Sequence, residues 1–93
     1  MSTSGVIARE AVVHGLVQGV FFRATCQQEA ERLGVSGWAR NESDGTVRVF
    51  LEGAPEDVES MLAWCRRGPR QAAVDRVEVV ERTPREESGF SVD

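Results

Sequence analysis

The pair Asp44-Gly45 stands between two runs of alternating apolar and polar residues, and this arrangement limits the possible folds more than any other feature. Such a pair is a strong signal for a tight β-hairpin turn. The runs on either side, 35–41 and 46–52, therefore predict two antiparallel strands. Alternation places every second side chain on the same face of a strand. In the later run the apolar face consists of Val47, Val49 and Leu51.

A helical pattern flanks this hairpin on each side. The earlier stripe is Phe22, Cys26, Ala30 and Leu33, and the later one is Val58, Met61, Leu62 and Cys65. Both follow the i, i+3/i+4 spacing of one face of an α-helix. Gly34 suits the end of a helix over 22–33, and Pro55 suits the first position of a helix that Gly68-Pro69 would stop. We therefore expect two helices of about three turns each.

Three more segments predict strands. Residues 6–14 and 74–82 are rich in valine, and their expected core side chains are Ala11, Val13, Val77 and Val79. Residues 90–93 are expected to form a short terminal strand that buries Phe90 and Val92, with a frayed chain end as the alternative. The acidic connection 84–88 is expected to lie in solvent.

The order of elements is βαββαβ, which predicts a ferredoxin-like, two-layer α/β (α+β) sandwich: an antiparallel sheet with two helices on one face. The chain length suits one domain over 6–93, preceded by a flexible N-terminal tail over 1–5. This scaffold carries RNA-binding proteins, metal chaperones and enzymes. The fold alone therefore does not identify a function.

Composition narrows the classes of partner. Eleven arginines against fifteen acidic residues give a net charge of −4, which disfavours nonspecific binding to nucleic acid. We expect no membrane span and no secretion signal, and therefore a cytoplasmic protein. Cys26 and Cys65 lie on apolar helix faces and are expected to be reduced and buried. With one His and two distant Cys, the sequence predicts no metal site.

The segment from Gly15 to Arg23 has an unusual charge placement. Two glycines occur in a short loop, and Arg23 falls in the first turn of the expected helix, where the helix dipole disfavours a cation. A bound anion would reverse that effect, because loop and helix N–H groups together with a guanidinium can hold a phosphoryl group. The segment therefore predicts a phosphate cradle. The alternative is an ordinary glycine turn followed by a solvated arginine.

Two stretches closely resemble the paired signatures of the acylphosphatase family. They are Val13-x-Gly15-x-Val17-Gln18-Gly19-Val20-x-Phe22-Arg23 and Gly37-Trp38-Ala39-Arg40-Asn41-x3-Gly45-x-Val47-x5-Gly53. Their separation and the chain length also fit. The resemblance implies cofactor-independent hydrolysis of acyl phosphates to a carboxylate and inorganic phosphate, which would also act as an inhibitor. Arg23 matches the family's phosphate-binding arginine, and Asn41 matches the asparagine that orients the attacking water.

The resemblance also assigns roles to the rest of the loop. The residues implied to bind the substrate phosphate together with Arg23 are Leu16, Val17, Gln18, Gly19, Val20, Phe21 and Phe22. Gly15 and Gly45 are expected to give structural support. No second pocket for the acyl group is evident in the sequence, and no convincing nucleophile–base pair is present. We expect a monomer with a small-molecule substrate.

Two other functions remain open from the sequence. One is a noncatalytic phosphate- or anion-binding or protein-interaction module on the same fold. The other is an RNA-binding domain, which would need exposed aromatic side chains on the sheet and a basic surface. Trp38 and Phe50 could lie on that face, but the acidic balance argues against RNA. Trp38 is otherwise expected to pack over the sheet.

Overall fold

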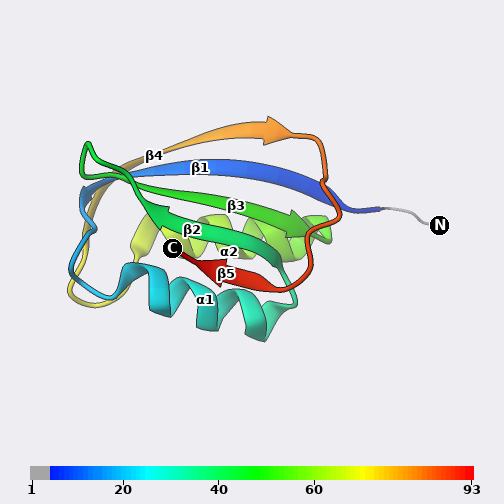
Figure 1. Ribbon diagram of the computed structural model, residues 1–93, viewed down its shortest axis with the longest axis horizontal. Coiled ribbons are helices and arrows are strands. Elements are labelled where there is room, and N and C mark those ends of the chain that lie inside the picture. Colours follow the sequence, from blue (N-terminus) through cyan, green and yellow to red (C-terminus); the bar gives the residue numbers. More distant parts are fainter. Residues whose placement is uncertain (1–4) are drawn as a thin grey trace.

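The computed structural model describes residues 5–93, in which two helices pack against one five-stranded sheet (Figure 1). The tail predicted for 1–5 lies outside the described residues except for Gly5. The elements are β1 (Ile7–Leu16), α1 (Phe22–Leu33), β2 (Ser36–Asn41), β3 (Val47–Gly53), α2 (Pro55–Arg67), β4 (Ala73–Arg82) and β5 (Phe90–Val92). The predicted order is therefore confirmed, and so is the short terminal strand expected within 90–93, which forms β5.

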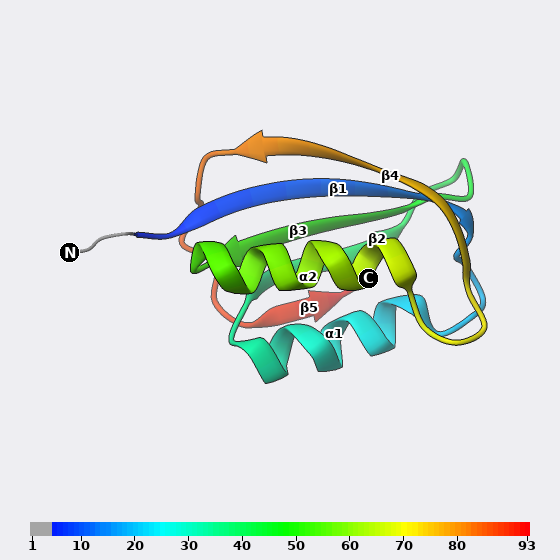
Figure 2. The ribbon, with the colours of Figure 1, turned by 180° about the vertical axis from the view of Figure 1, so that it is seen from behind.

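The strand order across the sheet is β4-β1-β3-β2-β5, and both helices lie on the same face (Figure 2). Strands β1 to β4 form antiparallel pairs, as predicted, with Ala39 opposite Val49 in the hairpin. β5 instead runs parallel to β2. The prediction of a purely antiparallel sheet is wrong in this respect. The chain leaves β4 at one edge, crosses to the other edge and runs alongside β2 in the same direction.

The core lies between the helices and the sheet. The side chains predicted to face inward from β1, β3 and the two helices are buried, among them Ala11, Val13, Val47, Val49, Leu51, Cys26, Val58, Met61, Leu62 and Cys65. Gly34 ends α1 in the left-handed conformation, also as predicted. Trp64 was missed by the helical pattern but is buried, and its ring packs against Phe22 with centroids 5.0 Å apart.

Two side chains predicted to lie in the core are more exposed than expected. Val79 and Val92 are each 36% exposed, whereas Val77 is partly buried against the core. Both belong to the edge strands β4 and β5, which have a neighbouring strand on only one side. The helices cover the central strands more fully (Figure 2). The alternating pattern of a strand indicates which side chains share a face, but it does not indicate which strand lies at the edge of the sheet.

The face of β3 opposite the helices is more covered than its polar residues suggested. Phe50 is fully buried, stacked on Trp38 with centroids 5.9 Å apart, and the guanidinium of Arg85 lies 4.9 Å from its ring centroid. Glu52 is also buried, and its carboxylate accepts hydrogen bonds from the main-chain N–H groups of Arg85 and Glu87. The 84–88 connection is largely exposed, as predicted, but its main chain is anchored to the sheet.

Cys26 and Cys65 are free thiols buried in the core. The contact with the Cys65 thiol and burial together raise the pKa of Cys26 well above the ordinary cysteine value. Both thiols therefore behave as small apolar side chains. Within residues 5–93, no helix is long and apolar enough to cross a membrane.

Candidate active site

The loop between β1 and α1 presents a row of main-chain donors. In the described chain, no main-chain N–H group of residues 17–24 donates a hydrogen bond to another protein group. Gly19 and Phe21 both have positive φ, +74° and +64°, and Phe21 is the N-cap of α1 without a side-chain capping bond. A left-handed residue followed by helical residues directs successive N–H groups into one concavity, which suits an anion.

The start of α1 strengthens this positive character. Its first turn holds no acidic side chain, so nothing there balances the partial positive charge of the helix N-terminus. Arg23, which is partly exposed, adds a full charge in the same turn. The loop and the first turn of α1 thus combine the helix dipole, unpaired main-chain N–H donors and the Arg23 guanidinium, and all three favour binding of an anion.

Arg23 is attached to the far edge of the sheet. Its guanidinium donates a hydrogen bond to the main-chain oxygen of Asp93, and the N–H of Asp93 donates in turn to the oxygen of Ala39, 3.0 Å away. Gln27, one turn later, donates to the main-chain oxygen of Phe90 at 2.8 Å. These contacts fix the beginning of α1 beside β5 and β2.

Arg23 and Asn41 line the same cavity, which has a volume of about 310 Å³. Its lining residues are Val17, Gly19, Phe21, Phe22, Arg23, Ala24, Asn41 and Val92. Most of the predicted phosphate-binding loop therefore borders this cavity. Leu16, Gln18 and Val20 do not line it, and Leu16 is 61% exposed at the end of β1.

Asn41 is the last residue of β2 and is exposed at the mouth of the hairpin. Within residues 5–93 its side-chain amide makes no hydrogen bond, so both its donor and its acceptor are available to a ligand or water. The hairpin itself is held firmly. The N–H and hydroxyl of Thr46 both donate to Asp44, at 3.0 and 2.6 Å, and these bonds lower the pKa of the Asp44 carboxyl.

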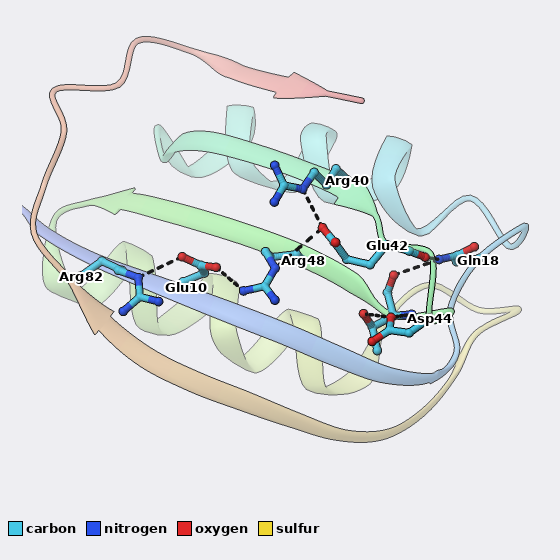
Figure 3. Close-up of polar contacts among 8 residues, drawn as sticks. Glu10, Gln18, Arg40, Glu42, Asp44, Arg48 and Arg82 are labelled. Carbon is cyan, nitrogen blue, oxygen red and sulfur yellow. Dashed lines mark hydrogen bonds and ion pairs between the residues drawn. The ribbon is translucent and has the colours of Figure 1, made fainter.

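Gln18 has a role that the sequence did not reveal. Its side-chain amide donates to the main-chain oxygens of Glu42 and Thr46, at 2.8 and 2.9 Å, across the gap between loop and hairpin (Figure 3). The side chain thus faces the hairpin that follows Asn41, although the sequence grouped Gln18 with the phosphate-binding loop. The only sequence signal for such a cross-link is that Gln18, which has two amide N–H donors, lies in a loop between two glycines.

Two residues beside the loop lie outside this cavity. His14, which was not among the predicted site residues, is hydrogen-bonded to Glu78 at 2.7 Å, and this contact lowers the pKa of the Glu78 carboxyl. Gly15 lies at an irregularity in the β1–β4 pairing, with φ of +126°. Among the residues that the structure describes, no three His, Cys, Asp or Glu side chains form a group that could hold a metal ion.

Comparison with known proteins gives one consistent family. The sequence model of the family described as Acylphosphatase matches residues 9–92. A protein named Acylphosphatase from Acidovorax sp. (strain JS42) is 45% identical over 84 residues, which cover 90% of this chain and 87% of that protein. One of the same name from Thermococcus kodakarensis is 49% identical over 80 residues, which cover 86% of this chain and 88% of that protein. The solved structure of an acylphosphatase from Coxiella burnetii has a TM-score of 0.91 and 35% identity, and the match covers 95% of this chain and 93% of that one.

Proposed function

The chain belongs to the acylphosphatase family and hydrolyses acyl phosphates, and we propose that loop 16–22 and Arg23 hold the phosphoryl group while Asn41 positions the attacking water. The observation that carries this proposal is that Arg23 and Asn41, from α1 and β2, line one cavity. Neither residue has a side-chain ion pair in the described part of the chain. Both therefore keep hydrogen-bonding groups for a ligand.

The phosphoryl group would be bound by charge and by main-chain donors together. Arg23 offers a planar fork of N–H groups that matches two phosphoryl oxygens. The unpaired N–H groups of the loop and of the first turn of α1 would bind the remaining oxygens. Phosphoryl transfer passes through a loose transition state with charge spread over these oxygens. Donors fixed in advance would stabilise that charge without rearrangement during the reaction.

Asn41 would act on the water rather than on the phosphate. Its amide oxygen can accept a hydrogen bond from the water while its N–H₂ donates to a neighbouring oxygen. An amide cannot remove a proton, so a phosphoryl oxygen of the substrate would take it as the water attacks in line. The phosphorus–oxygen bond to the acyl group then breaks, and the products are a carboxylate and inorganic phosphate. A carboxylate leaves readily, so positioning supplies most of what is needed.

Neither alternative function gains support. A noncatalytic module would bind phosphate without turnover, and no observation favours it. An RNA-binding sheet needs open aromatic faces, but Phe50 is fully buried beneath Trp38 and Arg85, and the guanidinium of Arg40 lies 4.8 Å from the Trp38 ring centroid.

The test is turnover of benzoyl phosphate by Arg23→Ala, measured together with inhibition by inorganic phosphate. Losing a charge-assisted contact costs about 1.5–3 kcal/mol, so phosphate affinity should fall roughly 10- to 150-fold, and turnover should fall further. Arg32→Ala is the matched control, because Arg32 lies on the same helix at its other end and, within residues 5–93, forms an ion pair only with Glu29. Wild-type turnover and phosphate inhibition in Arg23→Ala would refute the assignment.

Asn41→Ala separates the two proposed roles. It should lower kcat by about 10²–10³ while phosphate inhibition stays within a few-fold of wild type, because the water and not the phosphate loses its partner. Gln28→Ala, an exposed amide on α1, is the control. A large loss of phosphate affinity with unchanged kcat would reverse the roles. Unchanged turnover in the presence of EDTA would support hydrolysis without a metal cofactor.

A further inference from the structure

Phe21 combines two properties that stability does not explain. It is 71% exposed, the largest exposed fraction among the large apolar side chains of residues 5–93, and its φ of +64° lies in the left-handed region. A bulky residue is uncommon there and is held at a cost in free energy. Such strain normally persists where surrounding structure or function requires it. Burial cannot be the reason here, because the ring is mostly in solvent.

Helix capping does not explain the residue either. Phe21 is the N-cap of α1 but makes no side-chain capping bond, and Asn or Asp would suit both the cap and the positive φ better. The neighbouring Phe22, by contrast, is buried and packs on Trp64. The exposed ring is thus available for a contact that the described residues do not supply.

The position of Phe21 indicates what that contact is. Phe21 lines the cavity that Arg23 and Asn41 also line, and Val92 of β5, itself 36% exposed, lines it from another element. A volume of about 310 Å³ is within the range of small-molecule pockets and exceeds what a phosphoryl group needs. The cavity therefore has a polar part suited to phosphate and an apolar part formed by residues from two separate elements.

We propose that Phe21 and Val92 bind the acyl group, so that the enzyme prefers acyl phosphates with a bulky apolar acyl group over acetyl phosphate. The inference rests on the proposed function of the same site. An apolar acyl group that is buried against the Phe21 side chain is removed from water, and its binding free energy improves in proportion to the apolar area buried. A preference of roughly 10- to 100-fold in kcat/KM is expected, as is usual for discrimination by an apolar pocket.

The experiment compares cyclohexanecarbonyl phosphate with acetyl phosphate, because their carboxylate leaving groups have similar basicity. The readout is the ratio of the two kcat/KM values. Phe21→Asn should lower this ratio about tenfold without lowering the melting temperature, since Asn tolerates the left-handed conformation and can cap the helix. Phe21→Tyr keeps the ring and should keep the ratio. Val92→Ala should lower the ratio by a smaller factor.

The control is Val80→Ala, which removes an exposed apolar side chain from β4, outside the cavity lining, and should leave the ratio unchanged. A wild-type ratio near one, or a ratio that Phe21→Asn leaves unchanged, would overturn the acyl-group assignment. If inorganic phosphate still competes with both substrates in that case, the proposed function stands and only the acyl subsite is wrong. If Arg23→Ala retains turnover and phosphate inhibition, both proposals fail together.

Discussion

The side-chain amide of Gln18 donates a hydrogen bond to the main-chain oxygen of Thr46, 2.9 Å away. Its second donor reaches the oxygen of Glu42 at 2.8 Å (Figure 3). Each oxygen also accepts a main-chain hydrogen bond inside the hairpin: the Thr46 oxygen from the N–H of Glu42, and the Glu42 oxygen from the N–H of Gly45. Gln18 is therefore not essential for satisfying these oxygens. Its effect is to fix the distance between the loop and the hairpin that follows Asn41.

Gln18→Met should reduce activity more than stability. The variant keeps the side-chain length but removes both donors, which is worth about 1–2 kcal/mol of unfolding free energy. A looser gap between Arg23 and Asn41 should lower kcat about tenfold, because small displacements of reacting groups have large effects on rate. Melting curves and kcat are the measurements. A normal kcat with a lowered melting temperature would reduce Gln18 to a structural contact.

Gln18→Glu supplies a distinguishing pH signature. An ionised carboxylate has no donor and would face two carbonyl oxygens, so kcat should fall further than in Gln18→Met. Protonation restores one donor, so kcat relative to wild type should recover as the pH falls toward roughly 5. A ratio to wild type that does not change with pH would contradict the cross-linking role.

Glu10 forms the centre of an ion-pair network on the sheet face opposite the helices (Figure 3). It is 7% exposed and accepts hydrogen bonds from Arg48 and, at 3.0 Å, from Arg82. Burial by itself raises the pKa of this carboxyl, but the two guanidinium groups outweigh burial and hold the pKa below the ordinary glutamate value. The native state therefore favours the ionised form.

The lowered pKa of Glu10 gives a stability prediction with a definite sign. A depressed carboxyl pKa contributes stability above the unfolded-state value of about 4.3, and this contribution is lost as the pH falls through the folded-state value. Glu10→Gln should lower the free energy of unfolding by about 1–2 kcal/mol at pH 7. In denaturant titrations the difference from wild type should shrink as the pH falls below the unfolded-state value and disappear once Glu10 is protonated in the folded state.

Glu81→Gln is the matched control for this measurement. Glu81 has an 84% exposed side chain, and its contact with Arg9 is 3.7 Å long, so its loss should have almost no effect. Equal destabilisation by both variants, or a Glu10→Gln effect that persists in acid, would show that the network does not act through the Glu10 charge.

At Gly15, near the end of β1, the main chain of β4 leaves no room for a side chain. A Cβ atom there would lie 2.2 Å from the main-chain oxygen of Ala73, and φ is +126°. Gly15→Ala should therefore lower the melting temperature by 10 °C or more, on the order of 3 kcal/mol. Gly45→Ala is the control, because its φ is also positive but nothing lies within 4 Å. Similar melting temperatures for the two variants would contradict the steric argument.

Much of this fold follows from local patterns. The helical stripes and the alternation of Val47, Val49 and Leu51 predicted buried faces correctly, because helix and strand periods are fixed by backbone geometry. The exposure of Val79 and the parallel direction of β5 could not be predicted in this way. Both depend on which strand lies at the edge of the sheet, which is set by long-range pairing.

The candidate active site could likewise be predicted only in part from the sequence. The charge anomaly at Arg23 pointed to an anion, and family resemblance supplied Asn41. That the two residues share a cavity depends on the sheet, because β2 lies beside β5, and because Asp93 and Phe90 accept hydrogen bonds from Arg23 and Gln27 of α1. The direction of the Gln18 side chain and the left-handed conformation of Phe21 are equally tertiary features. No spacing in the sequence indicates them.

Phosphate binding at the loop is tested most directly by titration with inorganic phosphate followed by amide NMR. The largest chemical-shift changes should occur at the main-chain N–H groups of residues 19–23 and at the Asn41 side chain. Arg23→Ala should abolish these changes, while Arg32→Ala should retain them. Changes confined to the sheet face around Glu10 and Arg48, or changes that persist in Arg23→Ala, would contradict the central claim that this loop and Arg23 bind the phosphoryl group.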